Sequence, residues 1–253
     1  MSEPLKFNIL DTEVYFPSRD DFNYLITNIN ENKNKYIVIT NTHGIYLGQV
    51  TKEMRDANKF SYMCVSDSYV LNYCAYFLYG KKAEKVFLGS KIMTEICEIA
   101  EKKGNLSIGL FGSTQKNIKM LKKNLFIKYP KLNISYHYSP PFRELTLEEN
   151  QTIIKDINES QVDILFVGLG CPKQEIWMLE NSKHINSLSL GVGAAFDFIA
   201  YPSKEIPNFI HFIGLGWFFR LFFSPKRLFK RYIIFGSLFI IKLLKQKINQ
   251  LRI

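Results

Sequence analysis

Residues 163–175 read DILFVGLGCPKQE, and this short stretch contains the signals of a strand, a turn and the start of a helix. The apolar run 163–167 has the composition of a strand that is covered on both faces. Gly168 and Gly170 then allow a tight turn with close backbone approach. Pro172 suits the first turn of a helix, where its missing N–H costs nothing. The stretch therefore predicts the strand-to-helix unit of a parallel α/β sheet.

Short apolar runs alternate with longer helical patterns along most of the chain. Strands are expected at 36–39, 61–65, 86–88, 106–111, 133–136, 163–167 and 188–192, and helices at 90–103, 114–128 and 146–159. The opening FNILDTEVYF, residues 7–16, predicts a small hairpin ahead of them. Such alternation implies parallel pairing with right-handed crossovers. We therefore expect an α/β fold: a Rossmann-like parallel sheet with helices on both faces.

Polar and glycine residues cluster just after the predicted strands. In sheets of this kind, ligands bind outside the carboxyl ends of the strands. The segments that this rule selects are 40–44, 66–68, 89–91, 112–115, 168–175 and 193–197. We expect these loops to face one crevice.

Two of these loops have features that suit an anionic ligand. After Gly168 and Gly170, the free N–H groups of a helix start favour an anion, Lys173 adds a positive charge, and Gln174 offers a bidentate amide. A nucleotide diphosphate would fit such a loop, and so would an ordinary strand–turn–helix junction with a solvated lysine. The segment 109–115, GLFGSTQ, fits either a phosphate cradle that includes Gly112 or a simple helix cap by Ser113 or Thr114.

Asp67 directly follows a predicted strand and is a candidate general base. The alternative is that it caps a helix over 69–78; Asp197 has the same ambiguity. No DxD motif occurs, and the four histidines form no metal-binding pattern such as HExxH. We therefore expect a protein without a metal or other cofactor.

The C-terminal segment, residues 206–253, contains no Asp or Glu. Of the chain's formal net charge of +10, it carries nine positive charges, on Arg220, Lys226, Arg227, Lys230, Arg231, Lys242, Lys245, Lys247 and Arg252. Aromatic and aliphatic residues lie between them, a combination that suits an anionic bilayer surface. We predict a core domain at 1–205 and a basic, aromatic-rich, helical membrane-associating appendage at 206–253. Its apolar run 232–241 is about half of the ~20 residues that a spanning helix needs.

The N-terminus has neither the basic nor the apolar region of a signal peptide. Four cysteines without CxxC spacing fit reduced thiols in a cytosolic protein. With the basic segment, these features predict peripheral attachment to the cytoplasmic face of the cell membrane.

Three blocks of sequence carry a resemblance to a known family. VGLGCPKQEIWM (167–178), GVGAAFDFIA (191–200) and GLGWFFRLFFSPKRLFKRY (214–232) are similar, in order and spacing, to the signature blocks of the WecG/TagA/CpsF glycosyltransferases. The resemblance covers roughly residues 8–235. It implies an enzyme that moves a sugar from a UDP-sugar to an acceptor linked to polyprenyl diphosphate.

The resemblance also implies roles for individual residues. Asp67 matches the family's catalytic aspartate, although Ser68 replaces the glycine that follows it in the family pattern. Lys91 and Gly216 likewise stand where that pattern has an aspartate and a glutamate. The substrate-binding candidates are Thr40, Asn41, Gly112, Gly168, Gly170, Pro172, Lys173, Gln174, Glu175, Arg220, Arg227 and Arg231.

The leading hypothesis is an inverting glycosyltransferase that donates N-acetylmannosamine or a related hexose in cell-surface polysaccharide synthesis. Its partners would be a UDP-sugar, a lipid-linked glycan acceptor and an anionic membrane surface, and a homo-oligomer is compatible with the sequence. One alternative, an NAD(P)-dependent oxidoreductase, requires a GxGxxG turn after the first strand, which is missing. The other, a non-catalytic nucleic-acid-binding protein, would use the basic segment on phosphates, but its cations lie among aliphatic residues, so no nucleic-acid partner is expected.

Overall fold

The computed structural model describes residues 4–204, 206, 208–223 and 228–252. Within these residues the strands form an eight-stranded sheet in the order β1-β2-β4-β3-β8-β7-β5-β6. The hairpin strands β1 and β2 are antiparallel, and the other pairings are parallel. The strands are β1 (Leu5–Ile9), β2 (Thr12–Phe16), β3 (Tyr36–Thr40), β4 (Met63–Ser66), β5 (Ser107–Gly112), β6 (Asn133–Tyr138), β7 (Ile164–Gly168) and β8 (Leu188–Gly191).

Helices follow most of the parallel strands. The longer ones are α1 (Arg19–Thr27), α2 (Thr42–Val50), α3 (Lys52–Phe60), α4 (Tyr69–Tyr79), α5 (Gly89–Lys103), α6 (Gln115–Lys128), α7 (Leu147–Glu159), α8 (Lys173–Asn181), α11 (Gly216–Phe223) and α13 (Phe235–Gln250). The shorter ones are η1 (Ile29–Asn32), η2 (Ser182–His184), α9 (Ala195–Ala200), η3 (Pro202–Lys204), α10 (Asn208–Phe212) and the π-helical turn η4 (Lys230–Ile234).

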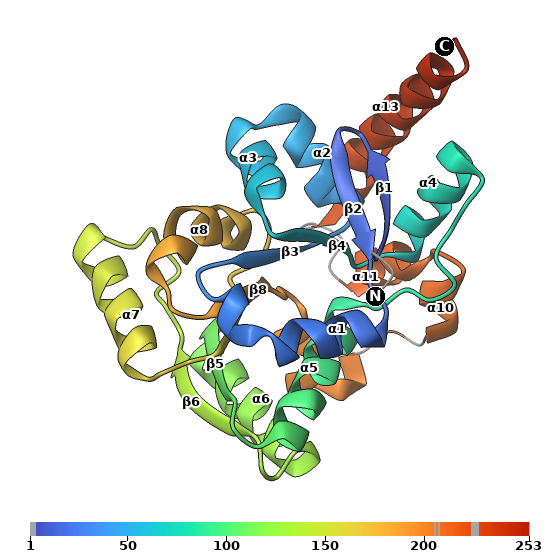
Figure 1. Ribbon diagram of the computed structural model, residues 1–253. Coiled ribbons are helices and arrows are strands. Elements are labelled where there is room, and N and C mark those ends of the chain that lie inside the picture. The colour runs from blue at the N-terminus through green and yellow to red at the C-terminus, as the bar shows by residue number, and fades with distance from the viewer. Residues whose placement is uncertain (1–3, 205, 207, 224–227, 253) are drawn as a thin grey trace.

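Residues of β3, β4, β5 and β7 enter two different hydrophobic cores, because successive side chains point to opposite faces of a sheet. In β3, Ile37 and Ile39 pack with α1, α5, α6 and α9 on one face. Tyr36 and Val38 belong to the core on the other face, with α7 and α8. Figure 1 shows these two helical layers on either side of the sheet. The predicted α/β sheet with helices on both faces is confirmed and is consistent with a Rossmann-like fold; the sheet is mixed because the hairpin strands are antiparallel.

One predicted strand is wrong. Residues 86–88 form no strand but an extended connection between α4 and α5. Val86 and Phe87 are nevertheless buried, at 7% and 5% exposure. An apolar composition indicates that a segment is buried. A covered connection and a central strand are both buried, so composition alone could not distinguish them here.

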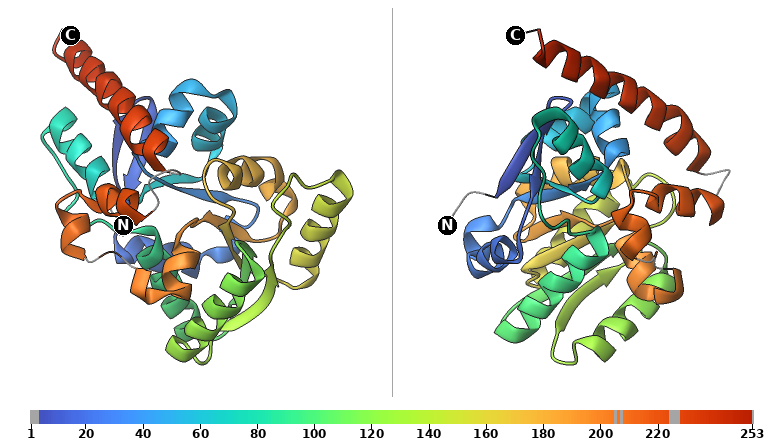
Figure 2. Two further views of the ribbon diagram at one scale, coloured as in Figure 1. Left: turned by 180° about the vertical axis from the view of Figure 1, so that it is seen from behind. Right: turned by 90° about the vertical axis from the view of Figure 1, so that its right-hand side faces the viewer.

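The C-terminal segment contributes to a third core. Phe239 and Leu243 of α13 are buried with residues of the β1–β2 hairpin, α2 and α4. Gln246 accepts a hydrogen bond from the Leu10 backbone N–H at 2.9 Å, and Lys247 donates one to the Leu78 carbonyl at 2.8 Å. The far end of α13 projects beyond the rest of the molecule (Figure 2). Helix α13 of the segment 206–253 therefore packs against the segment predicted as the core domain, and the boundary at residues 205–206 stays a prediction.

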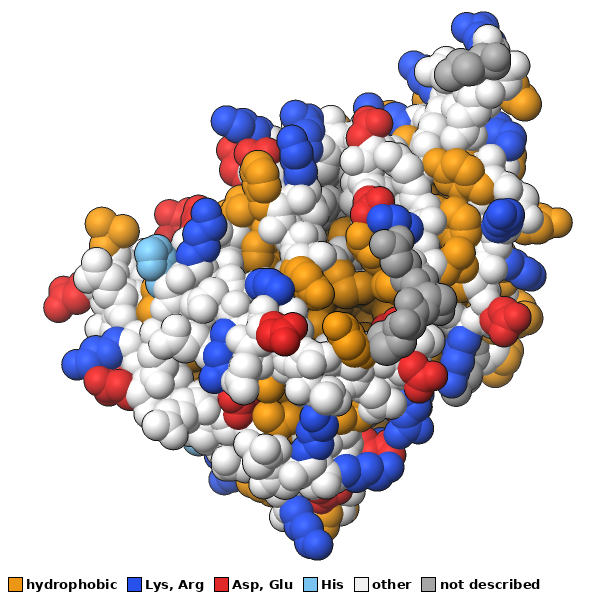
Figure 3. Space-filling model, in the orientation of Figure 1, with side chains coloured by type: hydrophobic (Ala, Val, Ile, Leu, Met, Phe, Trp, Pro, Cys, Tyr) orange, Lys and Arg blue, Asp and Glu red, His pale blue; other side chains and the backbone are white. Residues whose placement is uncertain are grey.

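The outer surface around α4 and α13 mixes hydrophobic with basic side chains, at the upper right of Figure 3. Exposed residues of α13 include Ile240, Ile241 and Leu244, at 56%, 49% and 47%. In the described part of the chain, no helix reaches the length and hydropathy needed to cross a bilayer.

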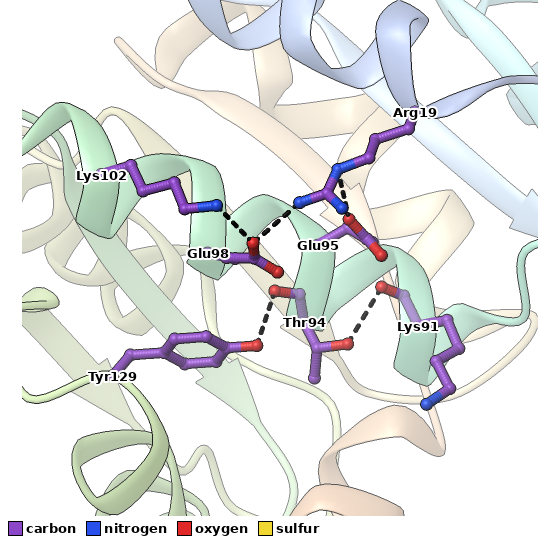
Figure 4. A network of polar contacts seen from close by, with 7 residues as sticks. All are labelled: Arg19, Lys91, Thr94, Glu95, Glu98, Lys102 and Tyr129. Carbon is purple, nitrogen blue, oxygen red and sulfur yellow. Dashed lines mark hydrogen bonds and ion pairs between the residues drawn. The ribbon is translucent and has the colours of Figure 1, made fainter.

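Ion pairs connect helix α1 to α5 on the face of the sheet that these two helices cover together with α6 and α9. Arg19 lies 3.1 Å from a Glu95 carboxylate oxygen and 2.8 Å from one of Glu98, and Lys102 reaches Glu98 at 2.6 Å (Figure 4). Tyr129 donates a hydrogen bond from α6's C-terminal end to the Thr94 carbonyl at 3.0 Å. Because these groups are partly solvated, they orient the helices and contribute little stability.

Replacing Phe239 tests how firmly α13 is held. Phe239 is 2% exposed, so Phe239→Ala should lower the free energy of unfolding by about 3–5 kcal/mol through lost burial and a new cavity. Ile241→Ala, at a half-exposed position of the same helix, should change it by less than about 1 kcal/mol. Urea unfolding followed by circular dichroism measures both. An unchanged midpoint in Phe239→Ala would mean that α13 does not stabilise the core.

Candidate active site

A cavity of about 350 Å³ lies where β3 and β4 end. Residues just after these strands line it, with Asn41 and His43 from one loop and Asp67 and Ser68 from the other. Arg231 reaches it from the C-terminal segment. A recess of about 30 Å³ adjoins it and shares Asp67. Residues separated by more than 160 positions in the sequence thus meet at the edge of the sheet where ligands are expected.

Asp67 is half-buried and held by backbone groups on two sides. Its own N–H donates to the Thr40 carbonyl at 2.7 Å, and its carboxylate accepts a hydrogen bond from the Gly89 N–H. A side chain at Gly89 would lie 3.4 Å from that carboxylate oxygen, which is a close contact. The helix that follows, α4, is capped by Ser68, whose hydroxyl accepts from the Val70 N–H at 3.1 Å. Asp67 is therefore not the helix cap, and it is one of the residues that line the cavity.

Asn41 and Arg231 connect the sheet to the C-terminal segment. Asn41 caps α2 by accepting from the His43 N–H at 3.0 Å, and the same oxygen accepts from Arg231 Nη2 at 3.3 Å. Arg231 Nε and His43 Nδ1 are buried, and neither has a hydrogen-bond partner among the described residues. A buried donor without a partner is costly. These atoms are therefore candidates for contact with a polar ligand.

His43 is kept neutral by its surroundings. Burial, with a further contribution from the Arg231 charge, lowers the pKa of His43 to about 4. Its ring stacks on Phe235, with centroids 5.5 Å apart, and Phe235 also stacks on Tyr46 at 5.3 Å. Among the lining residues that the structure describes, the positive charge at this end of the cavity therefore comes from Arg231.

The loop from Gly168 to Glu175 is stabilised from within. Gln174 is 3% exposed; its side-chain oxygen accepts from the Gly170 N–H at 3.1 Å, and its amide nitrogen donates to Glu175 at 2.9 Å. Gly170 has a φ of +85°, a conformation that favours glycine. Pro172, after a cis peptide bond, directly precedes α8, and Lys173 is exposed. The Gln174 amide thus shapes the loop in this structure.

Gly112 and Gly168 lie side by side on β5 and β7. Gly112 has a φ of +127°, and a Cβ there would lie 2.5 Å from the Gly168 carbonyl carbon. Only glycine fits such an approach. In the loop that follows Gly112, Thr114 caps α6: its hydroxyl accepts a hydrogen bond from the Asn117 N–H at 3.1 Å. The side-chain amide of Asn117 donates in turn to the Asp197 carboxylate at 2.6 Å.

The predicted site residues divide into two groups. Asn41, Asp67 and Arg231 line the cavity together. The others with described side chains or backbone positions do not line it: Thr40, Gly112, Gly168, Gly170, Pro172, Lys173, Gln174 and Glu175. Arg220 lies in α11, but the structure does not describe its side chain. Arg227 lies outside the described residues. The binding roles of all these residues stay predictions.

The structure adds cavity residues that the sequence did not single out, including Tyr69, His211 and Tyr232. Tyr69 belongs to a helix start after a strand, a position that the carboxyl-end rule could have included. His211 and Tyr232 belong to the C-terminal segment, and no local pattern indicates which of its residues turn toward the sheet.

Glu175 provides a test of the buried charge near the cavity. It is 1% exposed, and burial raises its pKa to about 7 from an ordinary value of 4.5. The folded protein therefore retains a proton that the unfolded chain loses, so stability falls as pH rises from about 4.5 to 7. Glu175→Gln should remove this loss of unfolding free energy, which is on the order of 3 kcal/mol once the pH is above the raised pKa.

Urea unfolding at pH 5 and pH 8 measures this effect. The exposed Glu180 on the same helix supplies the matched control, since Glu180→Gln should keep the wild-type pH dependence. An identical pH dependence in wild type and Glu175→Gln would contradict the raised pKa.

Comparison with known proteins places the chain among sugar-transferring enzymes. The profile described as "Glycosyl transferase WecG/TagA/CpsF family" matches residues 7–253. A protein of Staphylococcus aureus (strain NCTC 8325 / PS 47) is 27% identical over 141 residues, covering 55% of this chain and 53% of the relative. A protein of Bacillus subtilis (strain 168) is 28% identical over 152 residues, covering 59% and 57%.

Both relatives are named N-acetylglucosaminyldiphosphoundecaprenol N-acetyl-beta-D-mannosaminyltransferase. The region of this chain that matches covers only about half the length of each of these curated relatives. Since the profile of the family covers nearly all of the sequence, the chain belongs to the glycosyl transferase WecG/TagA/CpsF family.

Proposed function

We propose that this protein is an inverting glycosyltransferase that moves a hexose, N-acetylmannosamine or a related sugar, from a UDP-sugar to an acceptor on polyprenyl diphosphate. Family membership and the printed names of the relatives support this activity and a lipid-linked acceptor. The observation that carries the proposal is the cavity, which has a carboxylate, Asp67, and a cation, Arg231, in its lining.

Asp67 would act as the general base. Its carboxylate would take the proton of the acceptor hydroxyl while the hydroxyl oxygen attacks the anomeric carbon of the donor. The bond from that carbon to the UDP oxygen breaks in the same displacement, so the configuration inverts. The hydrogen bond from the Gly89 N–H would keep the carboxylate in place during this step.

UDP leaves with the bonding electron pair, and its negative charge needs stabilisation. Arg231 is the cation of the described cavity lining, and Arg220, Arg227 and Lys173 are further proposed contacts. The glycine turns at Gly112, Gly168 and Gly170 would bring backbone N–H groups close to phosphate, as helix starts do in other nucleotide sites. Thr40, Pro172, Gln174 and Glu175 would support these loops. Charge stabilisation by such preorganised groups is a large part of catalysis.

The C-terminal segment would hold the enzyme at the cytoplasmic face of the membrane as a peripheral protein. Its exposed residues include Phe209, Phe212 and Phe218, at 67%, 61% and 56%. Basic residues near an anionic bilayer contribute about 1 kcal/mol each. The segment would thus bring the cavity, which Arg231 helps to line, to the surface where a lipid-linked acceptor resides.

Asp67→Asn tests the assignment of the base. The variant should bind UDP within a few-fold of wild type but turn over at least about 100-fold more slowly, because the amide cannot accept the hydroxyl proton. UDP release and product formation on a lipid-linked acceptor measure turnover. Asp56→Asn, on α3 and outside the cavity lining, should leave both quantities unchanged. Turnover of Asp67→Asn near the wild-type rate would remove Asp67 from the mechanism.

Chelation tests the expected metal independence. In the described residues, no three His, Cys, Asp or Glu side chains come together as a metal site. Activity in excess EDTA should therefore stay within about two-fold of the untreated enzyme, since cationic side chains can stabilise leaving phosphates. Complete loss that Mg²⁺ or Mn²⁺ reverses would contradict the expectation.

A further inference from the structure

The lining of the cavity changes in character from one end to the other. At the sheet edge it is polar, with Asn41, Asp67 and Arg231. Farther along α4 and α13 it is apolar, with Val70, Cys74, Phe239, Ile240 and Leu243. Along a helix, the eight residues from Arg231 to Phe239 span about 12 Å. The cavity therefore has a cationic end and an apolar end at a distance that one elongated ligand can bridge.

The apolar end is open to the surface at Ile240. This side chain lines the cavity, yet it is 56% exposed. Its neighbours at the surface are apolar too, since Ile241 and Leu244 of α13 and Tyr76 of α4 are 49%, 47% and 57% exposed. A chain that leaves the cavity here would continue along these exposed apolar side chains; around α4 and α13, Figure 3 shows hydrophobic side chains mixed with basic ones.

A ligand that satisfies both ends carries an anionic head and a hydrocarbon chain. The volume of about 350 Å³ is near the lower end of the range for small-molecule sites, so only a short part of a long lipid would fit. The relatives' printed name describes an acceptor that joins a diphosphate to undecaprenol. A prenyl diphosphate has both features that the cavity requires.

We propose that the groove between α4 and α13 binds the first isoprene units of a prenyl-diphosphate acceptor, with the acceptor's diphosphate beside Arg231, which would then lie between this diphosphate and the departing UDP. The assignment rests on the proposed function and adds a subsite to it. The groove would let the enzyme distinguish lipid-linked acceptors from soluble glycans within the protein itself, apart from any attachment to the membrane.

Two soluble probes with the same head group separate the chain from the diphosphate. Farnesyl diphosphate carries three isoprene units and isopentenyl diphosphate carries one, and isothermal titration in detergent-free buffer measures both affinities. Because each buried methylene improves affinity about four-fold, wild type should bind farnesyl diphosphate at least ten-fold more tightly. Equal affinities for the two probes would overturn the proposal.

Two isoleucines of α13 provide a matched pair of variants. Ile240 lines the groove and Ile241 does not, while both are about half exposed, so neither change should unfold the protein. Ile240→Asn should reduce the preference for farnesyl diphosphate at least five-fold, and Ile241→Asn should leave it unchanged. If both variants lost this preference equally, the assignment of the prenyl chain to the groove would be wrong. Binding of dodecyl phosphate as tight as that of farnesyl diphosphate would replace the isoprenoid assignment by a general alkyl-chain site.

The binding readout is independent of sugar transfer. Asp67→Asn protein should keep the wild-type chain-length preference, because its apolar groove is unaltered. Chain-dependent binding in a protein that transfers no sugar would refute the proposed function and retain the groove. Sugar transfer by a protein without chain-dependent binding would refute the groove and retain the function.

Discussion

The parallel register between β3 and β4 determines where the site forms. Thr40 pairs with Ser66 at the ends of these strands, so the residues that follow, Asn41 and Asp67, emerge side by side. The bond from the Asp67 N–H to the Thr40 carbonyl extends this pairing one residue beyond the sheet. A shift of one residue would turn either side chain toward the opposite face, because side-chain direction alternates along a strand. The hydrophobic cores on both faces exclude such a shift.

The C-terminal segment supplies further residues of the cavity that Asn41 and Asp67 line. Arg231, Phe235 and Phe239 are spaced four residues apart, so they lie along one side of a helix. Phe235 stacks on His43 and Tyr46, and Phe239 is buried beside α2 and α4. Hydrophobic packing therefore supplies the free energy that holds Arg231 next to Asn41. The cation itself contributes charge to the cavity and needs no ion pair to stay there.

The sheet could be predicted from sequence because its central strands are short apolar runs that end in glycine or polar residues. Six parallel strands lie within two residues of their predicted starts, whereas Val86 and Phe87 are buried in a segment that pairs with no described strand. Asp67 and Asn41 could be selected since they follow strands directly. Arg231 could be selected only through the family resemblance, and its place beside Asn41 could not be predicted, because it depends on how a distant helix packs. The sequence suggested a surface-lying appendage. Along α13 the less exposed positions recur every three or four residues. Apolar side chains such as Ile240, Ile241 and Leu244 also occupy the exposed side of this helix, so its docking face appears only in the fold.

On the proposed function, the closure of the cavity by Arg231 and Phe235 would also set the order in which the enzyme becomes competent during its synthesis. Domains generally fold from their N-terminal parts as the chain emerges from the ribosome. The strands that carry Asn41 and Asp67 can pair once β8 has been made, while the residues that close the cavity follow some forty positions later. A nascent chain would thus hold a folded sheet and an open, unfinished cavity for part of its production. Competence to process a lipid-bound acceptor would arrive only with the segment proposed to bring the protein to that lipid.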